Sequence, residues 1–263
     1  MSQASANLNI MIKAARRASR SLLRDFGEVE NLQVSSKAAG DFVSKADIKA
    51  EEAIYNELSE ARPNYGWMGE ESEEKQGKDP TRRWIVDPLD GTSNFLHGIP
   101  HWAISIALEY KEEIIAGVIY DPIKDEMFTA EKGQGAWLND RRLRVSDRSN
   151  MIEMLFATGI PFGDKEGLND TLNELQKIMP KCAGVRRQGA AALDLAYVAA
   201  GRLDGYWERG VQAWDIGAGL LIAKEAGALI ESFKDSLESP LKSGSLICAN
   251  NLIFQSFTKI LRE

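Results

Sequence analysis

Two aspartates three residues apart carry the strongest chemical signal in this 263-residue chain. Asp87 follows the apolar run 84–86, which predicts a buried strand that stops at Pro88 and delivers Asp87 at its carboxyl end. Asp90 precedes a glycine turn and the segment 92–94, whose Thr, Ser and Asn are good N-cap types for a short helix. Carboxylates on a stiff bend suit Mg²⁺, and a helix N-terminus suits a phosphate. The stretch therefore predicts a combined metal and phosphate site.

An Asp-Gly pair is also common in ordinary tight turns, so the stretch alone leaves a purely structural explanation open. Two acidic positions elsewhere favour the site. Glu70 follows a short apolar run and Gly69, which lets the backbone approach closely, although the start of a charged loop is the simpler alternative. Asp215 falls in the first turn of a predicted helix, where small residues at 217–219 indicate close packing. An ordinary helix-start aspartate is the alternative there.

Three more charged residues have simple explanations when taken alone. Asp47 precedes a helical pattern over 48–58, where an aspartate is often only the N-cap. Asp41 and Lys37 resemble solvated surface charges. These residues gain meaning only beside the central stretch.

Composition and charge narrow the class of protein. Hydrophobic residues make up 44% of the chain and charged residues 27%, which is typical of a soluble globular protein. The net charge of -7, from 39 acidic and 32 basic residues, argues against nucleic acid as a bulk electrostatic partner. Cys182 and Cys248 are expected to be inert buried thiols, and His97 and His101 lack the partners of a zinc site. With no recognisable secretory leader or membrane-spanning run, we expect a cytoplasmic protein.

Hydrophobic periodicity predicts the elements that must position these residues. Helical spacing predicts an amphipathic helix over about 4–27, and alternation between residues 102 and 137 predicts an antiparallel meander. After Asp147 helices and strands alternate, so we divide the chain into 1–147, which holds most of the acidic positions, and an α/β subdomain over 148–263. The elements predicted in the second part are strands over 155–158 and 203–208 and helices over 168–179, 190–200 and 214–225.

Three motifs, in this order, resemble the inositol monophosphatase family of the magnesium-dependent, lithium-sensitive sugar-phosphatase superfamily. They are Gly69-Glu70-Glu71-Ser72, Asp87-Pro88-Leu89-Asp90-Gly91-Thr92, and Trp214-Asp215 with the small residues after it. The similarity covers nearly the whole chain. It implies an α+β fold, a layered αβαβα sandwich of two subdomains, usually as a homodimer. The implied activity is hydrolysis of myo-inositol 1-phosphate or a related phosphate monoester, as in a bacterial-type inositol-1-monophosphatase.

The resemblance also implies a role for individual residues. The implied ligands are Glu70, Asp87 and the Leu89 carbonyl oxygen for one Mg²⁺, and Asp87, Asp90 and Asp215 for a second. Glu70 and Thr92 would orient the attacking water, with Asp90 beside them as a catalytic residue. Lys37, Asp41 and Asp47 would form an outer shell that tunes a third, weaker Mg²⁺ position.

The implied substrate contacts come from both parts of the chain. They are Leu89, Asp90, Gly91, Thr92, Arg186, Gly189, Ala190, Ala191, Glu208 and Asp215. Gly91 and Thr92 would present backbone N–H groups to the phosphate, and Arg186 would lie near the substrate or the dimer contact. Ala190 stands where the family often has Ser or Thr. This departure removes one hydroxyl contact and weakens the case for narrow inositol selectivity.

The residues favour direct attack by water over a phosphoenzyme. An aspartyl phosphatase needs a nucleophile two residues before the second aspartate, and Pro88 occupies that place. A cysteine phosphatase needs Arg six residues after its cysteine, and Gln188 follows Cys182. A non-enzymatic regulatory module on this fold would be favoured by loss of a metal ligand, and each implied ligand is present. The remaining alternatives are broad specificity, or fructose-1,6-bisphosphate, NADP or histidinol phosphate as substrate.

Overall fold

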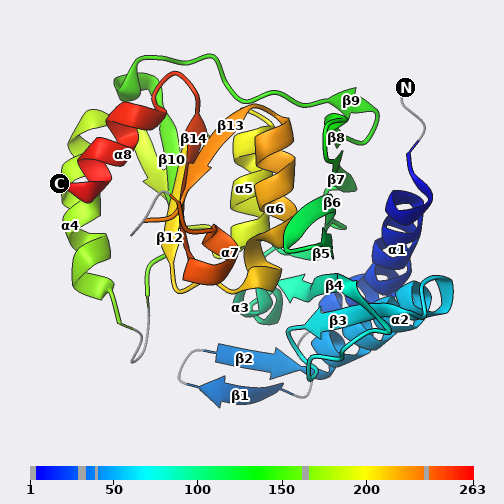
Figure 1. Ribbon diagram of the computed structural model, residues 1–263. Coiled ribbons are helices and arrows are strands. Elements are labelled where there is room, and N and C mark those ends of the chain that lie inside the picture. The colour runs from blue at the N-terminus through cyan, green and yellow to red at the C-terminus, as the bar shows by residue number, and fades with distance from the viewer. Residues whose placement is uncertain (1–3, 29–33, 39–40, 162–165, 234–236) are drawn as a thin grey trace.

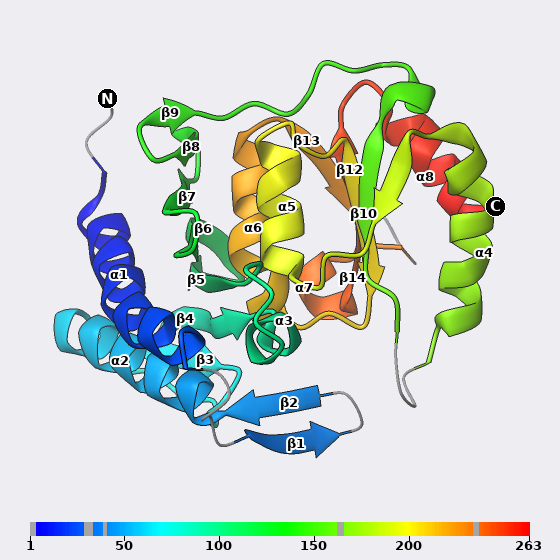
Figure 2. The same ribbon diagram turned by 180° about the vertical axis from the view of Figure 1, so that it is seen from behind.

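The protein is described here from a computed structural model, which defines residues 4–28, 34–38, 41–161, 166–233 and 237–263; the side chains of 34–38 and 41–44 lie outside this description. Two β-sheets alternate with three layers of helices, as Figures 1 and 2 show from opposite sides. The predicted α+β sandwich with αβαβα layering is thus confirmed.

The larger sheet has seven strands in the order β3-β4-β5-β6-β7-β8-β9. Only β3 and β4 run parallel in it, and its other neighbours are antiparallel, which confirms the predicted meander. Helices α1 and α2 cover its outer face, and β1 and β2 form a separate hairpin. The bounds are α1 (Ala6–Phe26), β1 (Val34–Ala38), β2 (Asp41–Ser44), α2 (Lys45–Ala61), β3 (Tyr65–Gly69), β4 (Asp79–Asp90), α3 (Thr92–Leu96), β5 (Ala103–Tyr110), β6 (Glu113–Asp121), β7 (Glu126–Glu131), β8 (Gly135–Leu138) and β9 (Arg141–Arg142).

The smaller sheet has five strands in the order β11-β10-β12-β14-β13 and mixes parallel and antiparallel pairs. Helices α5 and α6 fill the space between the two sheets, whereas α4 and α8 cover the outer face of the smaller one. The bounds are η2 (Met151–Glu153), β10 (Leu155–Thr158), α4 (Leu168–Ile178), η3 (Met179–Lys181), β11 (Gly184–Arg186), α5 (Ala191–Ala199), β12 (Gly205–Arg209), α6 (Ala213–Glu225), β13 (Ala228–Glu231), α7 (Pro240–Ser243), β14 (Ser245–Asn250) and α8 (Phe254–Arg262).

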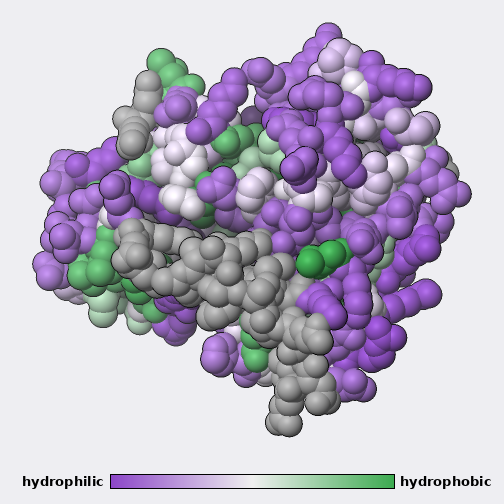
Figure 3. All heavy atoms as spheres, turned by 90° about the horizontal axis from the view of Figure 1, so that it is seen from below, coloured by the Kyte–Doolittle hydropathy of each residue, from purple (hydrophilic) through white to green (hydrophobic). Residues whose placement is uncertain are grey.

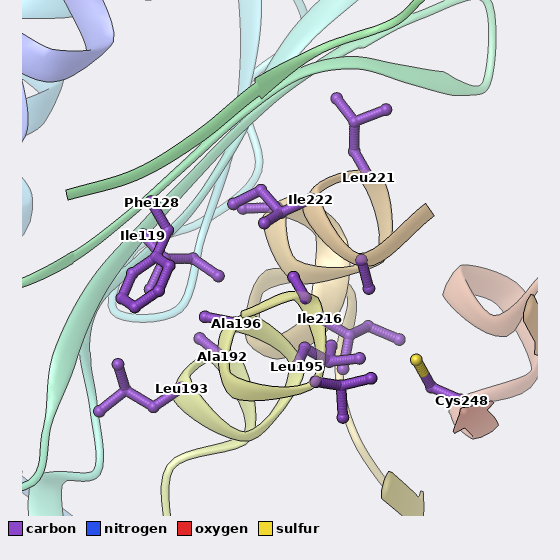
Figure 4. Close-up of a cluster of buried hydrophobic side chains, with 14 of the residues drawn as sticks. Ile119, Phe128, Ala192, Leu193, Leu195, Ala196, Ile216, Leu221, Ile222 and Cys248 are labelled. Atoms are coloured by element: carbon purple, nitrogen blue, oxygen red, sulfur yellow. The ribbon is translucent and has the colours of Figure 1, made fainter. Parts of the chain in front are cut away.

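The middle helix layer packs closely because its residues are small. Figure 4 shows Ala192 and Ala196 of α5 facing Phe128 of the larger sheet, with α6 alongside. A Cβ added at Gly219 would lie 2.6 Å from Leu195 Cδ1, so α5 and α6 depend on glycine at this contact. The small residues noted at 217–219 therefore serve helix packing as well as their place beside Asp215.

One hydrophobic cluster crosses the predicted boundary between 147 and 148, because it joins side chains of β5 to β8 with those of α5, α6 and β14. The boundary itself falls in the connection between β9 and η2, which has no regular structure. Division into two subdomains stays a prediction.

The surface and the cysteines agree with the composition. Hydrophilic residues cover most of the described surface seen in Figure 3, and a small hydrophobic group lies on the side of α4. Both cysteines are free and buried, as predicted. Burial raises the pKa of each thiol, Cys248 more than Cys182, which leaves both unreactive. No described helix is both long and apolar enough to cross a membrane.

The expectation that Pro88 stops its strand is wrong. β4 continues to Asp90, and the pairing shifts from Asp87 opposite Ser105 to Asp90 opposite Ala103. Three steps along β4 thus face two steps along β5, which is a bulge. A bulge tolerates proline because the ladder is already interrupted there.

Candidate metal and phosphate site

The bulge at the end of β4 brings the two central aspartates into the interior. Side chains alternate across a strand, so residues 87 and 90 of a regular strand would point to opposite faces. The extra residue removes that constraint. Asp87 is 3% exposed and Asp90 is 8% exposed, and the Asp87 carboxylate accepts a hydrogen bond from the Leu89 amide at 2.8 Å.

A left-handed turn at Gly91 follows directly. Its φ is +97°, and an added Cβ would lie 3.1 Å from the His101 carbonyl oxygen, so both conformation and space favour glycine. Gly91 is also the N-cap of α3, which corrects the expectation that a Thr, Ser or Asn side chain would cap this helix. The first turn of α3 therefore starts at Thr92, two residues after Asp90.

Asp47 belongs to the same site through Thr92. The helix α2 begins at Lys45, so Asp47 lies inside its first turn rather than before it, and it is fully buried. Thr92 Oγ1 lies 3.1 Å from Asp47 Oδ1 and 3.1 Å from the Leu89 carbonyl oxygen. The hydroxyl has one proton and can donate to either acceptor. Both contacts place the Thr92 side chain between α2 and the bulge.

Asp90 also meets the N-terminus of α5. Its carboxylate accepts hydrogen bonds from the Ala191 amide at 3.2 Å and from the Ala192 amide at 2.8 Å. Helix α5 starts at Ala191, and Ala190, predicted as its first residue, is the N-cap. An anion is stabilised at such a helix start. This contact joins the central stretch to the segment predicted to meet the substrate.

Asp215 occupies the first turn of α6, as predicted. It accepts a hydrogen bond from the Gln212 amide at 2.7 Å in a capping box. Its charge raises the pKa values of both Asp87 and Asp90, so it lies near them. The helix-start explanation is therefore confirmed, and the metal-ligand role of Asp215 stays a prediction that its place near the two aspartates supports.

The acids form one electrostatic cluster. The pKa of Asp87 is well above its usual value, first because of burial and then because of Glu70, Asp90 and Asp215. Burial and Asp215 raise the pKa of Asp90 in the same way, while the Ala192 amide opposes the shift. Buried like charges of this kind are costly without a compensating cation.

The chemistry of this donor set fits a hard divalent cation, because its side-chain donors are carboxylate oxygens. Among the described residues, no three His, Cys, Asp or Glu side chains are grouped so that they could hold an ion. Backbone amides hold the Asp87, Asp90 and Asp215 carboxylates instead. The residues that would hold a metal here are those predicted above.

Two polar residues around the predicted contact Glu208, namely Tyr206 and Asp194, were not predicted from the sequence. Tyr206 donates a hydrogen bond to Glu208, and buried Asp194 accepts one from Gln188 Nε2 at 2.9 Å. Burial raises the pKa of Asp194, and so does the Glu208 charge. Asp90 in turn contributes to the raised pKa of Tyr206, after burial and Glu208. An aspartate within an Ala-rich helix was the available signal for Asp194.

For the other predicted residues, the structure gives a position in the fold but no described contact with the acidic cluster. Gly189 adopts a φ of +80°, which fits the turn into α5. Arg186 lies on β11 with an exposed side chain, whose Nη1 donates to the Val185 carbonyl oxygen at 3.3 Å. Lys37 and Asp41 lie on β1 and β2, with side chains outside the described part, so their outer-shell role stays a prediction.

A family model described as "Inositol monophosphatase family" matches residues 4–263. The chain belongs to the inositol monophosphatase family. A Mesorhizobium japonicum protein named inositol-1-monophosphatase is 52% identical over 98% of this chain and 97% of its own length. A Pseudomonas aeruginosa protein named Nus factor SuhB is 44% identical over 95% of this chain and 93% of its own length.

Solved structures agree with this assignment. Extragenic suppressor protein SuhB from Bartonella henselae matches with a TM-score of 0.95 and 52% identity, covering 98% of this chain and 99% of its own. The Thermotoga maritima IMPase matches with a TM-score of 0.88 and 33% identity, covering 98% and 97%. The prediction that this member of the inositol monophosphatase family is a phosphatase is confirmed at the level of the family.

Proposed function

We propose that this protein is a Mg²⁺-dependent phosphomonoesterase that hydrolyses myo-inositol 1-phosphate and related polyol phosphates. One observation carries the proposal. The carboxylates of Asp87 and Asp90 are both buried, and they interact electrostatically at the end of β4, just before the first turn of α3. Glu70 and Asp215 add charge to the same cluster. Two or three Mg²⁺ ions, held by the predicted ligands, would supply the positive charge that phosphoryl transfer needs.

The chain's own residues would orient the reactants. Asp47 can accept a hydrogen bond from the Thr92 hydroxyl group. A lone pair on Thr92 Oγ1 can then accept a hydrogen bond from the attacking water. Glu70 would accept the water's second proton. The amides of Gly91 and Thr92 would bind phosphate oxygens. Water then attacks phosphorus as the bond to the polyol oxygen breaks, and the polyol oxygen takes a proton from solvent and leaves as a hydroxyl group. The configuration at phosphorus in a chiral thiophosphate substrate should therefore be inverted.

Glu208 and the N-terminus of α5 would bind the polyol. A carboxylate accepts hydrogen bonds from hydroxyl groups, whereas it would repel a second phosphate group. Glu208 therefore favours inositol phosphate over fructose-1,6-bisphosphate or NADP. Ala190 offers no hydroxyl, so we propose related polyol phosphates as additional substrates.

The proposal also covers the oligomeric state, the localisation and the absence of a nucleic-acid partner. We expect a homodimer in the cytoplasm, with no nucleic-acid partner held by bulk charge, since the net charge is -7. Light scattering at several protein concentrations tests the dimer.

The test is phosphate release from inositol 1-phosphate, fructose-1,6-bisphosphate, NADP, phosphoadenosine phosphate and histidinol phosphate. Each is measured with Mg²⁺, with EDTA, and with Mg²⁺ plus Li⁺. Release that requires Mg²⁺, is inhibited by Li⁺ and favours inositol phosphate supports the proposal. Equal rates would leave a broad phosphatase. No release from any substrate would contradict the proposal and favour the regulatory alternative.

A matched variant ties the activity to this site. Asp90→Asn keeps the shape of the side chain and one acceptor oxygen but removes its charge. We expect kcat to fall by about 10²-fold or more, with little change in Tm. Asp140→Asn, at an exposed aspartate, is the control. Retained turnover in Asp90→Asn would remove this residue from the site.

A further inference from the structure

Glu51 is a buried glutamate that the proposed chemistry does not use. It lies on α2, one turn after Asp47, and is only 4% exposed. Its Oε2 accepts a hydrogen bond from the backbone amide of Glu71 at 2.8 Å. A carboxylate buried so deeply needs a reason, because the charged form pays for its lost hydration. Its hydrogen-bond donor, the amide of Glu71, belongs to the residue directly after Glu70.

The path of the chain around Glu70 depends on this contact. A Cβ added at Gly69 would lie 2.5 Å from Glu51 Oε2 and 2.7 Å from its Cδ, so glycine is what lets the carboxylate reach the backbone. On the other side, the Glu70 amide donates to the Val86 carbonyl oxygen at 3.1 Å. Two successive amides are therefore fixed to different elements, one to β4 and the next to α2.

A second layer of contacts holds the same segment. Trp67 Nε1 donates to Ser72 Oγ at 3.0 Å, and the Trp67 ring meets Tyr55 edge-on with centroids 5.0 Å apart. Tyr55 lies one turn beyond Glu51 on α2. Helix α2 thus contacts the segment 69–72 directly at the Glu71 amide through Glu51, and indirectly at the Ser72 hydroxyl through the ring of Trp67. The contact through Glu51 is the one that acts next to Glu70.

We propose that Glu51 is a positioning residue, which sets the backbone of Glu70 so that its carboxylate faces Asp87. Glu70 contributes to the raised pKa of Asp87, so the two groups already lie close together. A hydrogen bond that a carboxylate accepts is stronger than one that a neutral group accepts, so Glu51 suits the task of holding the Glu71 amide in place. The inference rests on the proposed function, in which Glu70 binds metal and orients water.

The test compares Glu51→Ala and Glu51→Gln with two glutamates of the same helix. Glu52 is the exposed neighbour. Glu57 is buried like Glu51 but binds Arg17 and Lys13 of α1, so Glu57→Ala weakens the fold without touching the segment around Glu70. All variants are measured at a temperature well below their Tm. Readouts are kcat, KM and the affinity for Mn²⁺, followed through the electron paramagnetic resonance signal of free Mn²⁺.

For Glu51→Ala we expect kcat to fall by about 10²-fold, because small misplacements of a catalytic group are costly. KM should change by less than about threefold, since phosphate and polyol contacts lie elsewhere, and Mn²⁺ should bind several-fold more weakly. Glu51→Gln keeps an acceptor oxygen and should recover most of both losses. Glu52→Ala and Glu57→Ala should retain the kcat and Mn²⁺ affinity of the parent protein, although Glu57→Ala lowers Tm.

Two results would overturn the inference. One is parental kcat and Mn²⁺ affinity in Glu51→Ala. The other is an equal loss in Glu57→Ala, which would mean that stability alone explains the effect. If the parent protein releases no phosphate from any substrate, the proposed function fails, while the Mn²⁺ titration still decides whether Glu51 shapes the site.

Discussion

Asn94 joins two distant parts of the site, because its Nδ2 lies 2.8 Å from the Gln188 carbonyl oxygen and 2.8 Å from the His101 carbonyl oxygen. Asn94 belongs to α3, next to the predicted phosphate contacts, whereas Gln188 precedes the predicted polyol contacts. One amide group with two donors can satisfy both carbonyls. We therefore expect the distance between the predicted phosphate and polyol subsites to depend on this side chain.

Replacing Asn94 with alanine should loosen that link. Two carbonyl oxygens would lose their donor, which we expect to lower the free energy of unfolding by about 2 kcal/mol. KM for inositol 1-phosphate should rise by about tenfold, while inorganic phosphate inhibits almost as before. Denaturant unfolding and steady-state kinetics measure both effects. The exposed neighbour Ser93, changed to alanine, is the control. An unchanged KM would show that Gln188 is held by other contacts.

Mg²⁺ should stabilise the fold through the buried acids. Binding at 100 times Kd contributes about 2.7 kcal/mol, which raises Tm by roughly 5–10 °C in a chain of this size. Asp87→Asn should raise Tm without metal, because burial and then repulsion by Glu70, Asp90 and Asp215 raise the pKa of Asp87, and the neutral amide still accepts from Leu89. The same variant should lose most of the Mg²⁺ effect. Thermal scans with Mg²⁺ and with EDTA test this, and an undiminished Mg²⁺ shift in Asp87→Asn would place the ion elsewhere.

Gly159 should control the polyol subsite by its lack of a side chain. An added Cβ would overlap the Glu208 carboxylate, so Gly159→Ala must displace Glu208 from Tyr206. We expect KM for inositol 1-phosphate to rise by about tenfold and stability to fall by about 1–3 kcal/mol. Gly27→Ala is the control, since its Cβ would meet only backbone oxygens, the nearest at 3.4 Å. Unchanged selectivity across the substrate panel would argue against Glu208 as a polyol contact.

His101 should make stability depend on pH. Burial, with a smaller effect of Lys124, lowers the pKa of His101 from 6.5 to about 4. Between these values the unfolded chain binds a proton that the folded chain does not, so the free energy of unfolding falls as pH drops through this window. The full shift corresponds to roughly 3 kcal/mol, and we expect about half because the ring is partly exposed.

Two variants isolate this effect, because the chain has only two histidines. His101→Gln should flatten the loss of stability between pH 6.5 and pH 4 relative to the parent protein, since glutamine does not titrate. His97 is exposed, and His97→Gln should leave the parent profile unchanged. Chemical unfolding at a series of pH values gives the comparison. Identical profiles for both variants would contradict a half-buried His101 that stays neutral in this pH range.

The sequence by itself predicted many of the helices and strands and the main acids, because both leave local patterns, whereas the αβαβα layering was implied by the family resemblance. Apolar alternation marks the meander, helical spacing marks α1, and carboxylates that end apolar runs mark Asp87 and Glu70. It could not predict that β4 runs past Pro88, because a bulge depends on what the neighbouring strand offers. N-cap preferences also predicted a side-chain cap for α3, whereas Gly91 is its N-cap. The Thr92 hydroxyl lies instead between Asp47 and the Leu89 carbonyl oxygen.

Tertiary structure alone decided which distant residues meet. Asp47, Glu51, Asn94 and Asp194 have ordinary local explanations, such as a cap, a surface charge or a turn. Their partners are Thr92, Glu71, Gln188 with His101, and Gln188 respectively. Contacts of this kind depend on how helices pack on the sheets, and residue type and spacing do not carry that information. The sequence therefore marks the acids of the predicted site, whereas the side-chain contacts around them became visible only in the fold.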